Sequence, residues 1–248
     1  MTFVLLPPEI VESLADDAET LALIHSSELS PSMLTELRSI GFPDNLGLLP
    51  AGPSAAEAWT AMRCALDLLK ADADATEFDR LAADYASIYL TSGYGVSPCE
   101  STWFDDDHLI CQDAMFQLRE VYRAAGLGAA DWRRRSDDHF VLQLAYISHA
   151  LRNAKAVGDW RGIAQVMDEH LLRWLPEFAA RIAHRCDTAF YAGLAVLTAA
   201  WCEEFRDMIA EQLGEPRPSR EEIELRLNPK PQAVPIPIHF VPSVGPVV

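Results

Sequence analysis

Three segments in the middle of the chain decide the fold: Asp84-Tyr85-Ala86-Ser87-Ile88-Tyr89-Leu90, Ser97-Pro98-Cys99-Glu100-Ser101-Thr102-Trp103 and Asp137-Asp138-His139-Phe140. The first lies at the end of a helical pattern, which we expect Thr76 to cap and Gly93-Tyr94-Gly95 and Ser97-Pro98 to end. The third opens another helix, for which Ser136 is the expected cap. The apolar residues of these two helices recur at helical spacing: Phe78, Leu81, Tyr85 and Ile88 in one, and Phe140, Leu144, Ile147 and Leu151 in the other.

Similar helix signals lie on both sides of these segments. Ser30-Pro31 is typical of a helix start with Gly41 as its stop, and Ser54-Ala55-Ala56-Glu57 predicts a capping box. Further helices are predicted over residues 109–125, 166–184 and 187–213, and a short capped one begins at Ser219-Arg220-Glu221-Glu222. The longest pattern carries Phe190, Leu194, Leu197, Trp201, Phe205 and Met208 at spacings of three and four.

No segment before residue 230 shows sustained period-two alternation, which strands require. We therefore predict an all-α fold, a single helical-bundle domain over residues 1–228. After Asn228 the chain carries a proline every few residues between apolar side chains, which prevents a helix. Residues 229–248 are predicted to be an extended Pro-rich tail, which is either a disordered terminus or docks into a groove between helices.

The charge balance limits the partners. The formal net charge is −17, and the chain has only three lysines, Lys70, Lys155 and Lys230. Nucleic-acid binders need basic patches, so we expect no nucleic-acid partner. The same charge favours the approach of a basic peptide.

The cysteines and the apolar runs suggest a compartment. Cys64, Cys99, Cys111, Cys186 and Cys202 form no Cys-x-x-Cys pair, which is typical of reduced thiols in a cytoplasmic protein. The N-terminus has no basic region before an apolar one, so we expect no secretion signal. The longest apolar run, residues 189–202, is too short to cross a membrane, and no stable membrane insertion is expected.

In this order, the three segments resemble the TorD/DmsD/NarJ family, the dedicated chaperones of molybdenum-cofactor oxidoreductases. A further match is His170-Leu171-Leu172-Arg173-Trp174-Leu175-Pro176, followed by Phe190-Tyr191, so that the resemblance covers residues 76–205. It implies a TorD-like bundle, a monomer or a domain-swapped dimer, that performs no covalent chemistry and needs no cofactor of its own. It further implies a cytoplasmic chaperone of the apo catalytic subunit of a molybdopterin oxidoreductase. Such a chaperone recognises the subunit's twin-arginine signal peptide, its mature part or both, and assists cofactor insertion and proofreading before export.

The resemblance also implies a peptide groove. Carried over by motif position, its residues are Tyr85, Ile88, Tyr89, Ser101, Trp103, Asp138 and His139. Asp138 can accept hydrogen bonds from guanidinium groups, and aromatic side chains near loop ends, such as Tyr89 and Trp103, can line a groove. Two positions depart from the family: Ile88-Tyr89 stands where Leu-Phe is commoner, and Cys111 where relatives often carry glycine.

Other function classes stay open. The chain contains no Gly-x-x-x-x-Gly-Lys-Ser/Thr and no Gly-x-Gly-x-x-Gly phosphate cradle. One alternative is a helical metal-dependent hydrolase that uses Asp105, His108, Asp138 and His139; another is a helical interaction module with no redox partner. The basic run at residues 133–135 is solvated surface, a partner for Asp137 and Asp138, or a contact for the phosphate of the cofactor or of a nucleotide.

Overall fold

A computed structural model describes residues 6–69, 75–104, 107–129, 131 and 135–228. Within these ranges the regular structure is helical and no β-strand is found, which confirms the all-α prediction. No described helix has both the length and the hydropathy that crossing a membrane requires. The contacts divide the chain into two units, with the boundary between Arg217 and Pro218.

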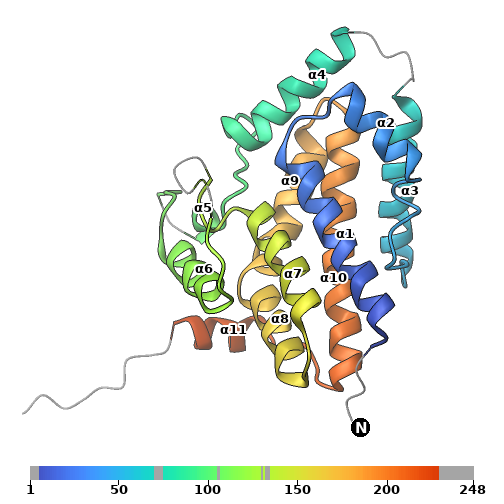
Figure 1. The fold of residues 1–248 in the computed structure, drawn as a ribbon. Helices are drawn as coiled ribbons and strands as arrows, with labels where there is room; N and C mark the ends of the chain where they lie inside the picture. Colours follow the sequence, from blue (N-terminus) through green and yellow to red (C-terminus); the bar gives the residue numbers. More distant parts are fainter. Residues whose placement is uncertain (1–5, 70–74, 105–106, 130, 132–134, 229–248) are drawn as a thin grey trace, which may run out of the picture. The chain divides into compact units, whose positions relative to one another are not determined.

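The first unit contains the bundle (Figure 1). Its helices are α1 (Pro8–Ser26), α2 (Pro31–Ser39), α3 (Pro53–Leu68), α4 (Ala75–Tyr85), α5 (Ser101–Phe104), α6 (Asp113–Ala124), α7 (Phe140–Asn153), α8 (Val157–Glu169), α9 (Leu175–Arg185) and α10 (Ala189–Leu213). A π-helical turn, η1 (Ala86–Leu90), extends α4, and a 3-10 turn, η2 (Leu171–Arg173), joins α8 to α9.

Helix α10 is the central element of this unit. Helices α3, α4, α8 and α9 pack against it, and α1 packs along α7. Gly193 of α10 faces α3 so closely that a Cβ there would lie 3.2 Å from the Met62 Cα. The predicted apolar stripe is confirmed for Phe190, Leu194, Leu197, Trp201 and Phe205, which are buried, whereas Met208 is half-buried.

The second unit contains α11 (Arg220–Leu227). The short capped helix predicted at Ser219 is confirmed, and its cap is a capping box: the Ser219 Oγ accepts from the Glu222 N–H, and the Glu222 carboxylate accepts from the Ser219 N–H at 2.7 Å. The Pro-rich tail, residues 229–248, lies outside the described residues, so its two interpretations stay predictions.

Several helix starts follow local signals. The Ser30 hydroxyl accepts from the Met33 N–H at 3.2 Å with Pro31 as the first helical residue of α2, and Gly41 follows that helix at φ +75°. A positive φ favours glycine because a Cβ would collide with the backbone. The predicted start of α10 was two residues early, since Thr188 is its N-cap.

Other predicted boundaries were wrong. Helix α3 begins at Pro53 after Gly52, so Ser54 lies inside the helix and forms no capping box. Helix α6 begins at Asp113 rather than residue 109, because His108 and Cys111 have left-handed φ values of 55° and 64°. Helix α7 begins at Phe140 with His139, not Ser136, as its N-cap.

The prediction of one continuous helix over residues 166–184 is also wrong. His170, at φ −123° and ψ −80°, ends α8, and α9 begins at Leu175 with Pro176 in its first turn. Proline has no N–H to donate and favours a new helix start over the continuation of an old one. Helix α1 was not predicted.

Candidate functional site

The sequence segments that resemble the chaperone family meet in space. The Tyr89 ring lies 6.2 Å from that of Phe140 at the start of α7, and the Trp103 ring lies 5.7 Å from that of Trp174 after η2. His170 Nδ1 lies 3.0 Å from the Glu100 Oε1. The four segments, which lie between residues 84 and 176, therefore form one site around the loop at residues 97–101.

This loop pairs with the start of α7 as a short antiparallel bridge. The Glu100 N–H donates to the Asp138 carbonyl at 3.1 Å, and the Phe140 N–H donates to the Pro98 carbonyl at 2.9 Å. The Asp138 side chain adds a third bond, because its Oδ2 accepts from the Ser101 N–H at 2.8 Å. Asp138 thus caps the first turn of α5 and holds the loop in place.

A buried polar cluster lies beneath the loop. The Glu100 side chain is fully buried, and its carboxylate accepts from the Gln143 Nε2 at 3.1 Å in addition to its contact with His170. Gln143 Nε2 also donates to the Asp138 carbonyl at 3.1 Å. Buried polar groups cost free energy unless they are hydrogen-bonded. The cluster therefore fixes the relative positions of the loop, α7 and the end of α8.

Tyr89 joins the site to α1 and α10. Its hydroxyl lies 2.6 Å from the His25 Nδ1, and the His25 Nε2 lies 2.8 Å from the Thr198 Oγ1. The Thr198 hydroxyl donates its own proton to the Leu194 carbonyl at 2.8 Å. His25 Nε2–H must therefore be the donor to Thr198, and the Tyr89 hydroxyl donates to Nδ1. Burial, and then the nearby His139, lowers the pKa of His25 to about 3, so this ring is neutral at pH 7.

Trp103 lines a cavity. The cavity has a volume of about 370 Å³, and its lining includes Trp103, Ser97, Thr102, His108 and Arg181. The half-buried indole donates from Nε1 to the Ser97 carbonyl at 3.0 Å, and the Arg181 guanidinium lies 4.7 Å from the ring centroid. Such a cavity, with an indole in its lining, can take an apolar side chain.

The other residues of the predicted groove lie deeper. Ile88 and Asp138 are 0% exposed, Ser101 is 1% exposed, and His139 and Tyr85 are 7% and 8% exposed. The Tyr85 hydroxyl donates to the Ser26 carbonyl at 2.9 Å. The His139 Nδ1 accepts from the Val141 N–H at 3.2 Å, and burial, aided by Arg135, lowers the pKa of His139 to about 3. In this conformation these side chains bind other parts of the chain, whereas Tyr89 and Trp103 are half-buried.

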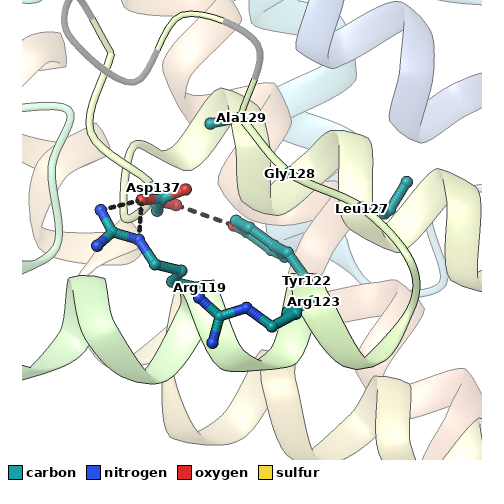
Figure 2. A pocket seen from close by; sticks show the side chains of 7 residues that line it. All are labelled: Arg119, Tyr122, Arg123, Leu127, Gly128, Ala129 and Asp137. Carbon is teal, nitrogen blue, oxygen red and sulfur yellow. Dashed lines mark hydrogen bonds and ion pairs between the residues drawn. The ribbon is translucent and has the colours of Figure 1, made fainter.

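Asp137, which the sequence analysis did not include in the predicted groove, lines a second cavity (Figure 2). Its volume is about 360 Å³, and α6 and the segment after it form most of the lining. Asp137 Oδ2 accepts from the Arg119 Nε at 2.9 Å and lies 2.7 Å from the Arg119 Nη2. The Tyr122 hydroxyl donates to the Asp137 carbonyl at 3.0 Å. The partner of Asp137 in the described residues is therefore Arg119, from α6; Arg133 and Arg134 of the adjacent basic run lie outside those residues.

The residues of the metal-hydrolase alternative are only partly described, because Asp105 falls outside the described ranges. Among the described residues no group of three or more His, Cys, Asp and Glu side chains is arranged to hold a metal ion. His108 is exposed, and its Nδ1 lies 2.8 Å from the Thr102 carbonyl oxygen.

Sequence reasoning missed several residues of the site. Glu100 and His170 stand inside quoted segments, but other polar residues adjoin them and no local pattern distinguished them. His25, Arg119 and Arg181 belong to helices outside those segments, and only the tertiary structure brings them to the site.

Comparison with known proteins identifies relatives of this chain. The family model described as nitrate reductase delta subunit matches residues 52–180, just over half of the chain. A Vibrio cholerae serotype O1 protein named "Chaperone protein TorD" is 24% identical over 142 residues, 54% of this chain and 64% of its own length. Proteins of the same name are 27% identical in Escherichia coli O8, over 71% of this chain and 86% of theirs, and 25% identical in Shewanella pealeana, over 54% and 62%. The chain thus covers somewhat under two thirds of the length of the Vibrio cholerae relative.

Proposed function

This chain belongs to the nitrate reductase delta subunit family, the TorD/NarJ family of maturation chaperones, and we propose that it is itself such a chaperone. Its client is the apo catalytic subunit of a molybdopterin oxidoreductase. In this proposal the protein binds the client's twin-arginine signal peptide in the cytoplasm, keeps the subunit open for cofactor insertion and delays export until loading is complete. The role is one of reversible binding and involves no covalent chemistry.

The observation that carries the proposal is the convergence of the family-like segments on one loop. The loop at residues 97–101 is bonded to the start of α7, contacts His170 through Glu100, and places Trp103 at a cavity. A peptide site needs a fixed frame and an accessible apolar surface. Both occur here, in a chain whose net charge of −17 favours a basic ligand.

The proposed groove residues divide into two roles. Trp103 and Tyr89, which are half-buried, would contact the apolar part of the peptide. Ser101, Asp138 and His139 would hold the loop and the helix start that shape the groove, through the bonds described above. Tyr85 and Ile88 would support the Tyr89 ring, which lies 4.7 Å from that of Tyr85.

Gene deletion and complementation in the native host test the proposed function. Deletion should abolish most molybdopterin-oxidoreductase activity of one enzyme and leave its catalytic subunit without molybdenum. The wild-type gene should restore both, and Trp103→Ala should restore neither at equal protein level. Trp103→Phe is the matched control, because it keeps an aromatic surface at the cavity and should restore most of the activity.

Two results would count against the proposal. Full activity and molybdenum content of every such enzyme in the deletion strain would remove the chaperone role. Full restoration by Trp103→Ala would keep the role but remove the cavity from the binding site.

A further inference from the structure

Arg119 of α6 lies between two groups that together resemble an arginine-binding site. On one side it contacts Asp137 Oδ2 through Nε and Nη2, at 2.9 and 2.7 Å. On the other side its guanidinium carbon lies 5.6 Å from the centroid of the Phe116 ring. A carboxylate that takes two N–H groups and an aromatic face that takes the cationic plane are what a guanidinium group recognises.

The fold holds Asp137 more firmly than it holds Arg119. The Asp137 side chain is 4% exposed, and its carbonyl is tied to the buried Tyr122 hydroxyl. The Arg119 side chain is 35% exposed and stands on the wall of the 360 Å³ cavity that Asp137 also lines (Figure 2). The carboxylate is therefore the fixed part, and Arg119 is the part that can swing out to solvent.

The charges of the described residues that line the cavity fit a cation better than an anion. Arg119 is neutralised by Asp137, and Arg123, which lines the same cavity, forms an ion pair with Glu120. Neither arginine is left as an uncompensated positive charge that would hold a phosphate. Once Arg119 leaves, the cavity keeps a buried carboxylate that needs a new positive partner.

We propose that Asp137 and Phe116 form a binding site for an arginine side chain of the client peptide, and that Arg119 occupies this site in the free protein. The proposal rests on the proposed function and adds a regulatory step to it. The incoming arginine replaces Arg119, which moves to solvent, so that the carboxylate is paired both before and after binding. Release of the client is then assisted by the return of Arg119.

Internal occupancy lowers the apparent affinity for the peptide. A site that is open only a fraction of the time binds more weakly by that fraction, so occupancy of about nine tenths by Arg119 costs about tenfold. Removing Arg119 should remove this cost. A peptide with lysine in place of arginine should gain less affinity from the removal of Arg119. The lysine ammonium is a point charge and does not match the planar fork of a guanidinium group.

Fluorescence anisotropy with the full-length protein tests this. The probe is a fluorescein-labelled peptide in which two adjacent arginines precede an alanine–leucine segment, with a second probe that carries lysines in their place. Arg119→Gln should bind the arginine probe about tenfold more tightly than wild type, and Asp137→Asn about tenfold more weakly. Arg123→Gln is the matched control: it removes the same charge from the same cavity without touching Asp137, and should change the affinity much less.

A second measurement uses the wild-type protein, so that it stands even if a variant folds poorly. The Arg119 Nε–H signal in an NMR spectrum, assigned by its loss in Arg119→Gln, should move when the arginine probe saturates the protein. Equal affinities of Arg119→Gln and Arg123→Gln, or an unmoved Arg119 signal at saturation, overturn this inference and leave the chaperone role intact. No binding of either probe to wild type or to any variant overturns the inference together with signal-peptide recognition.

Discussion

Asp138 was predicted from the sequence to bind the client's arginines, whereas its contacts in the structure indicate that it holds the loop at residues 97–101 in place. The residue is fully buried, and its Oδ2 accepts from the Ser101 N–H at 2.8 Å. The motif position could be read from the sequence, but the burial could not, because the loop that covers Asp138 comes from almost forty residues upstream. Its neighbour Asp137, which was not among the predicted groove residues, pairs with the Arg119 guanidinium group.

Replacement of Asp138 should therefore destabilise the fold. Asp138→Ala leaves the buried Ser101 N–H without its acceptor, which costs about 1–3 kcal/mol of the free energy of unfolding. Asp138→Asn keeps an acceptor oxygen at nearly the same place and should lose less. Thermal and urea unfolding, followed by circular dichroism, measure both. An Asp138→Ala protein with wild-type stability would mean that the loop does not depend on this bond.

At the scale of elements, the apolar periodicity predicted the helices better than the local caps predicted their ends. The buried faces of α7 and α10 follow the expected spacing, because packing against the rest of the bundle selects it. The starts of α3, α6 and α7 differ from the predictions by one to four residues. At α6 the left-handed residues His108 and Cys111 explain the late start, and neither is a residue type that signals this conformation as glycine does.

Helix α10 offers the clearest packing test. Leu197 is 0% exposed, so Leu197→Ala should lower the free energy of unfolding by about 2–5 kcal/mol through lost burial and a residual cavity. Leu23→Ala on α1 is the control, because that side chain is 58% exposed and the same truncation should cost less than about 0.5 kcal/mol. Equal effects of the two substitutions in urea unfolding would contradict the buried position of this face.

At the scale of the whole molecule, the fold class and the order of the site segments were predictable, whereas the contribution of α1 was not. Helix α1 packs along α7 and brings His25 to the Tyr89 hydroxyl. Nothing in its local sequence marks that histidine as part of a site, since both its partners are distant in the chain. Long-range packing of this kind cannot be read from a single sequence.

The two buried histidines should make the stability of the protein depend on pH. Burial lowers the pKa of both His25 and His139 to about 3 in the folded state, while the unfolded chain titrates near about 6.5. Between these values the unfolded state binds more protons, so stability should fall as the pH falls below about 6.5, by up to about 1.4 kcal/mol per pH unit for each histidine.

The variant His139→Asn isolates one of these contributions. Asparagine can still accept from the Val141 N–H as the N-cap of α7, but it does not titrate. Urea unfolding at a series of pH values between 7 and 5 should show a shallower loss of stability in this variant than in wild type. Parallel curves for the two proteins would mean that folding does not lower the pKa of His139.

The most direct test of the chaperone account is co-purification of the affinity-tagged protein from its native host, with mass spectrometry and metal analysis of what accompanies it. The account predicts a molybdopterin-oxidoreductase catalytic subunit that retains its signal peptide and lacks molybdenum, and that is lost when Trp103 is replaced by alanine. A preparation that carries no such subunit, or one that is already processed and loaded with cofactor, would contradict the account.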